Sequence, residues 1–167
     1  MTVPLFAVVF GFMLVEARRA SRNERAQRAR GGVEPPGDVY GLMQVLYPAS
    51  FLAMVAEGVW RGGPPLRFVV AGAALFAAAK ALKWWAILSL GPSWTFRVIV
   101  VPGSRRIVSG PYRFVPHPNY AAVVGEFIGV GLMTGAAVSG PLTLLAFAAL
   151  LVKRIAVEER ALRASTR

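Results

Sequence analysis

The chain contains 167 residues, of which 56% are hydrophobic, and its mean hydropathy of +0.54 is typical of a membrane protein. It has no cysteine and a single histidine, which excludes disulfides, cysteine nucleophiles and metal sites built from thiolates or several histidines. The formal net charge of +11 suits anionic lipid headgroups beside membrane spans, and no basic stripe alternates with aromatic residues as in nucleic-acid-binding proteins. We therefore expect membrane lipids as partners, with no nucleic acid and no metal ion.

Long apolar runs predict an all-α integral membrane protein with about five transmembrane helices in a single domain, residues 1–167. The first run is expected to be a retained span, because no basic segment precedes it and no small-residue cleavage site follows it. The last apolar region is longer than one span requires, and its Ser139-Gly140-Pro141 turn signal divides it into a hairpin of two helices. The spans are expected at about residues 3–17, 42–60, 68–90, 121–136 and 141–157.

Basic residues outside these spans predict the orientation of the chain in the membrane. Arginine and lysine are frequent in segments 18–30, 91–120 and 153–167, whereas the loop between the second and third spans has only Arg61 and Arg67. Since positively charged loops remain in the cytoplasm, the N-terminus is expected outside and the C-terminus inside. Segments 91–120 and 153–163 would then form the functional region on the cytoplasmic face.

The most unusual part of this region is residues 110–120, which contain the only histidine, His117, between Pro116 and Pro118. The two prolines restrict the backbone on both sides of the imidazole, and together with Pro111 they exclude a regular helix through the segment. A rigid polar and aromatic block of this kind, placed between two apolar runs, predicts a binding loop.

Charged residues near or within the spans leave alternatives open. Glu126 lies within the fourth apolar run, where a carboxylate costs on the order of 2–3 kcal/mol unless it is paired or faces a wet cavity. It is predicted either to pair with Lys80 or Lys83 of the third span or to line a cavity. Arg154 and Glu158 lie four residues apart on one helix face, and they form either a solvated ion pair or part of a site.

Trp94 and the glycines of the fourth span also allow two interpretations each. Trp94, at the predicted membrane boundary, is typical of an aromatic belt and is also a candidate contact for a bound substrate. Gly125, Gly129 and Gly131 contain a small-xxx-small pair, which either supports dimerisation or packs the helix hairpin.

Three motifs resemble the isoprenylcysteine carboxyl methyltransferases and their bacterial relatives in order and spacing. They are Gly110-Pro-Tyr112, Pro116-His117-Pro118-Asn119-Tyr120 and Glu158-Glu159-Arg-Ala-Leu162, and the resemblance extends over residues 84–162. Further segments are similar to small methyltransferases associated with type III polyketide synthases, which O-methylate alkylpyrones or alkylresorcinols. These segments are Ser21-Arg-Asn-Glu24, Gly31-Gly-Val-Glu34 and Trp85-Ala-Ile-Leu-Ser-Leu-Gly-Pro-Ser-Trp-Thr95. One departure is Pro116, where the family has an arginine.

The resemblance implies transfer of a methyl group from S-adenosyl-L-methionine to a lipophilic acceptor at a bacterial cytoplasmic membrane. O-methylation of a carboxylate or of a polyketide-type phenol or pyrone is expected, and the alternatives are a phospholipid N-methyltransferase and a non-catalytic lipid-binding scaffold. By motif position, the cofactor is expected to contact Ser104, Arg105, Arg106, Ile107, Tyr112, His117, Pro118 and Glu159. The expected catalytic residues are Arg154, Glu158 and His117, and the expected acceptor contacts are Glu126, Arg154 and Trp94.

Overall fold

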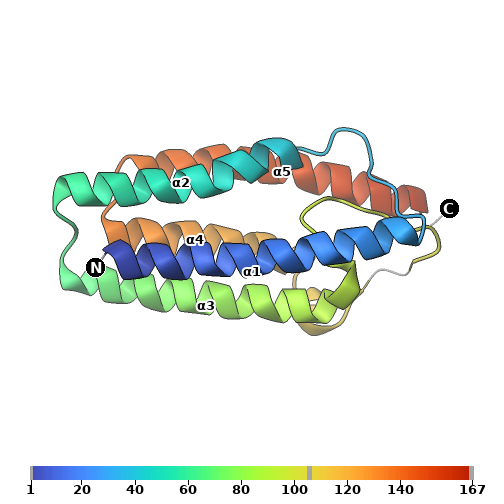
Figure 1. The fold of residues 1–167 in the computed structure, drawn as a ribbon, viewed down its shortest axis with the longest axis horizontal. Helices are drawn as coiled ribbons and strands as arrows, with labels where there is room; N and C mark the ends of the chain where they lie inside the picture. The colour runs from blue at the N-terminus through green and yellow to red at the C-terminus, as the bar shows by residue number, and fades with distance from the viewer. Residues whose placement is uncertain (1, 105–106, 166–167) are drawn as a thin grey trace.

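The structure, a computed structural model, describes residues 2–104 and 107–165. Over these ranges it is a bundle of five long helices, with two short 3-10 helices in the α3–α4 connection, residues 91–117 (Figure 1). The long helices are α1 (Thr2–Ala29), α2 (Tyr40–Arg61), α3 (Leu66–Leu90), α4 (Pro118–Thr134) and α5 (Ser139–Ser165), and the short ones are η1 (Gly91–Ser93) and η2 (Gly110–Arg113). The only β pairing among the described residues is an isolated bridge between Val33 and Val100. The predicted all-α fold is confirmed.

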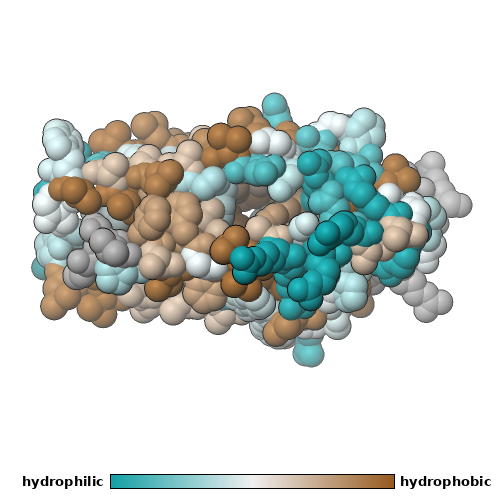
Figure 2. Space-filling view, viewed as in Figure 1, coloured by the Kyte–Doolittle hydropathy of each residue, from teal (hydrophilic) through white to brown (hydrophobic). Residues whose placement is uncertain are grey.

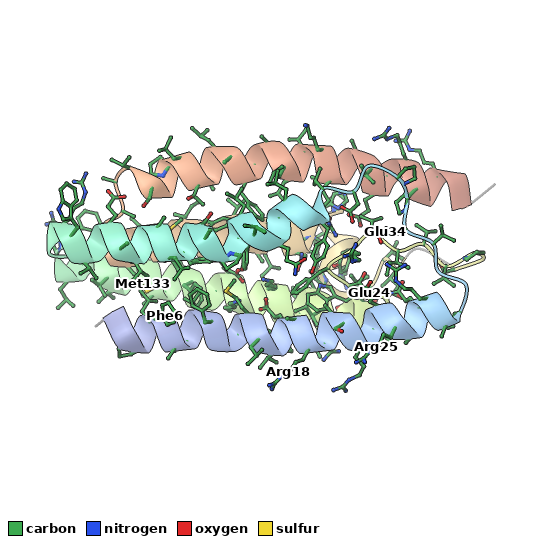
Figure 3. All side chains as sticks on the ribbon, turned by 45° about the horizontal axis from the view of Figure 1, so that its top comes forward. Phe6, Arg18, Glu24, Arg25, Glu34 and Met133 are labelled. Carbon is green, nitrogen blue, oxygen red and sulfur yellow. The ribbon has the colours of Figure 1, made fainter. Side chains whose placement is uncertain are left out.

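Helix α1 continues well beyond the predicted end of the first span at residue 17. The expectation of a basic loop directly after that residue is wrong. Residues 18–29 contain no glycine or proline and are rich in alanine and arginine, which favour a helix. The helix ends just before Gly31, which takes a positive φ of 80°. The arginines of residues 18–29, among them Arg18 and Arg25 (Figure 3), therefore lie on a helical extension and not in a loop.

Helices α2 and α5 are long and apolar enough to cross a membrane, α2 over its whole length and α5 over Ser139–Ala161. Only 22% and 28% of their most apolar stretches are buried inside the bundle, so most of these side chains face outward, as expected in contact with lipid. Figure 2 shows hydrophobic residues over the left part of the bundle and hydrophilic residues over the end that carries the α3–α4 connection. Membrane crossing by α1, α3 and α4, and the orientation, stay predictions.

The core between α2, α4 and α5 is a cluster of aromatic rings. Tyr47 and Phe51 of α2 meet Phe127 of α4 and Phe147 of α5, with ring centroids 4.9–5.7 Å apart. The three phenylalanines are buried, and each aromatic ring removes on the order of 150–250 Å² of surface from solvent. This cluster fixes the positions of the three helices, and Tyr47 and Phe147 also reach the cavity described below.

Helices α3 and α4 approach each other closely through glycines. A Cβ on Gly129 would lie 2.9 Å from the Gly72 carbonyl oxygen and 2.9 Å from Phe76 N, and a Cβ on Gly125 would lie 2.9 Å from Ala79 Cβ. The small-xxx-small pair therefore packs α4 against α3. It serves neither of the two expected purposes, the α4–α5 hairpin or a dimer contact, because α3 covers this face.

Gly129→Ala is expected to lower the free energy of unfolding by about 1–3 kcal/mol, because the new methyl group meets backbone atoms of α3. Gly131→Ala is the matched control on the same helix, since its Cβ would lie 4.0 Å from Gly140 Cα, an ordinary contact. We expect the control to be neutral or slightly stabilising through helix propensity. Thermal unfolding in detergent measures both, and equal shifts for the two variants would contradict the packing described.

Candidate functional site

The α3–α4 connection folds over one end of the bundle and is held there by α1. Helix α3 ends at Leu90, and η1 leads into Trp94, whose side chain is buried. Asn23 Nδ2 donates two hydrogen bonds, 3.0 Å to Gly91 O and 2.8 Å to Trp94 O. Gln27 Nε2 donates to Pro92 O at 3.1 Å. The helical extension of α1 therefore positions the start of the connection.

The loop between α1 and α2 makes a second contact with the same connection. Val33 and Val100 exchange two backbone hydrogen bonds of 2.9 Å. Beside them, Glu34 accepts hydrogen bonds from Arg97 Nη1 and Arg28 Nη2, both at 2.8 Å. Burial alone would raise the pKa of the Glu34 carboxyl, but these two hydrogen bonds outweigh it and hold the pKa below its usual range. The N-terminal part of the chain thus closes over the connection.

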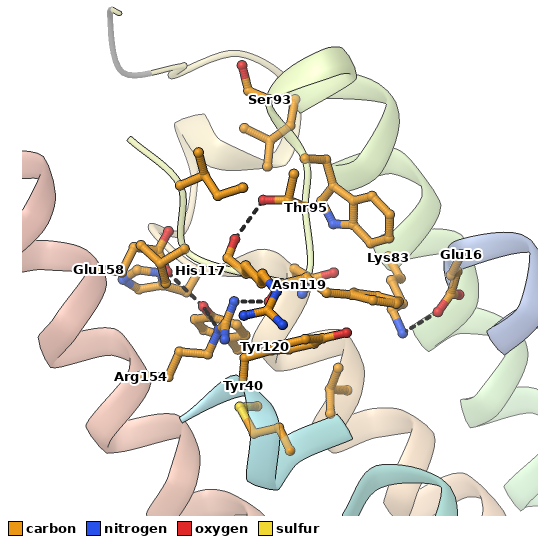
Figure 4. Close-up of a pocket in the computed structure, with 18 of the residues that line it drawn as sticks. Glu16, Tyr40, Lys83, Ser93, Thr95, His117, Asn119, Tyr120, Arg154 and Glu158 are labelled. Carbon is orange, nitrogen blue, oxygen red and sulfur yellow. Dashed lines mark hydrogen bonds and ion pairs between the residues drawn. The ribbon is translucent and has the colours of Figure 1, made fainter. Parts of the chain in front are cut away.

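A cavity of about 440 Å³ lies beneath the connection and extends between the helices (Figure 4). Its polar lining includes Tyr112, His117, Asn119, Tyr120, Arg154 and Glu158. Its apolar lining includes Met13, Met43, Pro48, Val123, Phe147 and Leu151. Helices α1 and α2 both contribute to the wall, and the surface is hollowed between them in Figure 2. The cavity therefore combines a polar region with an apolar wall made by the helices.

Arg154 of α5 is the centre of a hydrogen-bond network in this cavity. Nη1 donates to Asp38 Oδ1 at 2.8 Å, Nε donates to Tyr120 OH at 3.0 Å, and Nη2 donates to the Phe96 carbonyl oxygen. Tyr120 in turn donates to Glu158 Oε2 at 2.7 Å. The 5% exposure of Arg154 shows that the expected alternative of a solvated Arg154–Glu158 pair is wrong. These contacts to described residues use three of the five guanidinium N–H donors, which leaves two for a ligand.

His117 joins the start of α4 to the end of α5. Its Nδ1 lies 3.8 Å from Glu158 Oε2, its Nε2 lies 3.3 Å from Glu159 Oε1, and its ring stacks on Tyr120 with centroids 5.3 Å apart. Pro118 is the first residue of α4, where the missing N–H of a proline costs nothing. The expectation of an irregular segment through residue 120 is therefore wrong from Pro118 onward, because helix α4 begins there.

Tyr112 lies on η2 and lines the cavity. Burial raises the pKa of the Tyr112 phenol, and the negative charge of Glu158 raises it further, so the ring stays neutral at physiological pH. The turn that presents this ring requires glycine at position 110. Gly110 has a φ of 60°, and a Cβ there would overlap the Ser89 side chain. The positive φ of Gly110 and its close contact with Ser89 thus explain why the Gly110-Pro-Tyr112 motif begins with glycine.

The structure brings most of the predicted site residues to this one cavity. Those that line it are Ser104, Ile107, Tyr112, His117, Trp94, Arg154 and Glu158. Trp94 is buried in the protein, so it does not belong to a lipid-facing aromatic belt. Pro118 is buried in the first turn of α4 and Glu159 contacts His117, and neither lines the cavity. The predicted contacts Arg105 and Arg106 lie outside the described residues.

Glu126 belongs to a buried charged quartet formed by Glu16, Lys80, Lys83 and Glu126. Glu126 lies 2.9 Å from Lys80 Nζ and 3.3 Å from Lys83 Nζ, and Glu16 of α1 lies 2.8 Å from each lysine. Tyr47 OH also donates to Glu126. Of the two alternatives for Glu126, the structure shows pairing with the lysines. Glu126 does not line the cavity, so the structure gives no support to the predicted contact between Glu126 and the acceptor, which stays a prediction.

Sequence reasoning missed Glu16 and Asp38. A signal for Glu16 was present, because two lysines in the third span exceed the single carboxylate of the fourth and require a second acidic partner. For Asp38 no comparable signal exists. Its carboxylate accepts from Arg154 and from Val98 N at 3.0 Å, and both partners are distant in the sequence.

Comparisons with known proteins agree with this site. The model of the isoprenylcysteine carboxyl methyltransferase (ICMT) family matches residues 72–164. The chain is 30% identical to the uncharacterized protein YpbQ of Bacillus subtilis over 159 residues, which cover 95% of each protein. It is 24% identical to an uncharacterized protein of Haemophilus influenzae over 94% of this chain and 92% of that protein. No solved structure matches the chain. Since the family model covers more than half of the chain and includes the cavity's motif residues, the chain belongs to the isoprenylcysteine carboxyl methyltransferase family of membrane methyltransferases.

Proposed function

We propose that the chain is an S-adenosyl-L-methionine-dependent methyltransferase that O-methylates a lipophilic acceptor, with five membrane spans and its site on the cytoplasmic face of a bacterial membrane. The observation that supports this most is the cavity that joins Tyr112, His117 and Glu158 to an apolar wall contributed by α1, α2 and α5. A cavity of this kind allows a polar cofactor and an apolar acceptor to meet within the membrane protein.

The residues beneath the connection suit S-adenosyl-L-methionine, which when bound would supply a methyl group on a sulfonium cation. The neutral Tyr112 ring offers an aromatic face to such a cation, and Glu158, which lines the cavity, is an acceptor for its amino group or ribose hydroxyls. Asn119 Oδ1 is buried and has no hydrogen-bond partner among the described residues. Because Asn119 lines the cavity, this oxygen is available to a donor group on a bound molecule.

The charges beside Arg154 favour a phenol or enol as the acceptor over a carboxylate. Asp38 already neutralises Arg154 at 2.8 Å, and Pro116 lines the cavity where the family has an arginine. A carboxylate held here would be poorly compensated by the described residues, and an uncompensated buried carboxylate is costly. A polyketide-type phenol or pyrone avoids this cost, because its hydroxyl group is neutral until it loses its proton.

Methylation of a hydroxyl oxygen requires its proton to leave as the new carbon–oxygen bond forms. His117 is the proposed base, because its imidazole lines the cavity. The Glu158 and Glu159 carboxylates, 3.8 Å and 3.3 Å from its two nitrogens, hold the ring in position. Arg154 is proposed to stabilise the negative charge that develops on the acceptor oxygen through its remaining N–H donors.

Calorimetric titration of the detergent-solubilised protein with S-adenosyl-L-methionine tests the cofactor site. The wild type is expected to bind, and His117→Ala is expected to bind about tenfold more weakly, because the variant loses the ring between the two carboxylates. Arg113→Ala is the matched control, since Arg113 belongs to the same connection but is exposed and does not line the cavity. Absence of binding by the wild type at millimolar cofactor would contradict the proposal and favour a lipid-binding scaffold.

A further inference from the structure

The charged quartet is not fully enclosed by helices, because one side of it forms part of the cavity wall. Glu16 and Lys83 line the cavity together with Tyr47, whereas Lys80 and Glu126 do not. Figure 4 shows Lys83 and Glu16 across the cavity from Arg154. The cavity lining thus has two polar regions, one at Arg154 and one at Glu16 and Lys83.

Stability alone does not account for four charges at this depth. Their residues are 0–6% exposed, and the cost of removing charges from water offsets much of their mutual attraction. Apolar residues of similar volume in place of a buried ion pair are often neutral or stabilising. Ionisable side chains within membrane spans therefore point to a functional site.

Of the two charged side chains Glu16 and Lys83 on this wall, only the Glu16 carboxylate has hydrogen-bonding positions that its described partners do not use. Lys83 Nζ lies 2.8 Å from Glu16, 3.3 Å from Glu126 and 3.3 Å from Tyr47 OH, which occupies its three N–H donors. Each oxygen of Glu16 contacts one lysine at 2.8 Å, although a carboxylate has about four lone-pair positions. A molecule in the cavity is therefore met here by a hydrogen-bond acceptor and not by a free donor.

The neighbouring lining includes the apolar Met13, one turn from Glu16 on α1, and Met43 beside Gln44, one turn from Tyr47 on α2. We propose that Glu16 is the acceptor of a second polar subsite, which binds a hydroxyl group carried by the lipophilic substrate away from its methylated oxygen. The inference rests on the proposed function, since it takes this cavity as the acceptor site. A hydroxyl donates to Glu16, an ether has no proton to donate, and a carboxylate is repelled. The subsite therefore selects substrates with two hydroxyl groups, one methylated and one held at Glu16.

Two charge-neutral double variants separate this role from a structural one. Glu16→Leu with Lys80→Leu removes the carboxylate on the cavity wall and leaves Lys83 paired with Glu126. Glu126→Leu with Lys80→Leu removes the carboxylate away from the wall and leaves Lys83 paired with Glu16. Both remove one carboxylate and one ammonium group and keep one of the four ion pairs of the cluster. Both are expected to fold, because leucine replaces each charged side chain with an apolar one.

The probes are dodecan-1-ol and its methyl ether, which lacks only the O–H donor, and equilibrium binding to each protein in detergent is measured without cofactor. We expect the wild type and the Glu126→Leu/Lys80→Leu variant to bind the alcohol about tenfold more tightly than the ether. In Glu16→Leu/Lys80→Leu the two affinities are expected to be nearly equal. The same alcohol preference in both double variants, or no preference in the wild type, would overturn the proposal.

If a leucine pair does not fold, the comparison is repeated with Glu16→Met or Glu126→Met, each combined with Lys80→Met, because methionine also lacks a carboxylate or amide acceptor. The hydroxyl preference is measured without cofactor, so its outcome is separate from the proposed methyl transfer. Absence of S-adenosyl-L-methionine binding with an intact alcohol preference would count against the proposed function alone. Cofactor binding and methyl transfer without any alcohol preference would count against the Glu16 subsite alone.

Discussion

Arg154→Lys is expected to reduce methyl transfer by about 100-fold or more while binding of S-adenosyl-L-methionine changes little. Arg154 contacts Asp38, Tyr120 and the Phe96 carbonyl oxygen with three different nitrogen atoms. A lysine keeps the positive charge but has one nitrogen, so it cannot hold these three partners and still reach the acceptor. The substitution therefore separates the geometry of the guanidinium from its charge.

Methyl transfer is measured as the rate at which label passes from S-adenosyl-L-methionine to lipophilic phenols and pyrones, and cofactor binding is measured by calorimetry. Lys153→Ala is the control, because Lys153 is the neighbouring residue of α5 and its side chain is exposed. An Arg154→Lys variant with the wild-type rate would show that Arg154 does not act on the acceptor. A parallel loss of cofactor binding would show that Arg154 mainly holds the site together.

Glu126→Leu alone is expected to lower the free energy of unfolding by about 3–5 kcal/mol. The substitution leaves Lys80 and Lys83 with only Glu16 to balance them, in a cluster where Glu126 is 0% exposed. Adding Lys80→Leu removes the excess charge, so the double variant is expected to recover most of the lost stability. The effect of the second substitution should thus depend strongly on the first, because the two side chains are 2.9 Å apart.

Unfolding in mixed detergent micelles, measured for the wild type, both single variants and the double variant, completes the thermodynamic cycle. Lys80→Leu alone is expected to be destabilising as well, since it leaves two carboxylates for one lysine. Additive losses in the double variant would show that the quartet is not the coupled, buried cluster described here. The same four proteins also supply the control for the alcohol-binding experiment.

Local features of the chain predicted much of the fold and the location of the site. The Ser139-Gly140-Pro141 signal marked the hairpin, and α5 begins at Ser139 with the proline in its first turn. The motif residues His117 and Glu158, expected in one site, lie within 3.8 Å of each other. Helix α1 continues to Ala29, beyond the predicted end of the first span at residue 17, because hydropathy falls there while helix propensity does not.

The helical segments, the family and the motif residues of the site follow from the sequence, because run length, turn residues and motif spacing are properties of neighbouring residues. Which charges meet depends on the tertiary packing of distant segments. Glu16 contacts Lys80 across 64 positions of sequence, and Asp38 contacts Arg154 across 116. A periodic pattern shows which face of a helix is covered but not which element covers it. The pairing of these charges therefore depended on how α1 and the loop after it pack against α3 and α5.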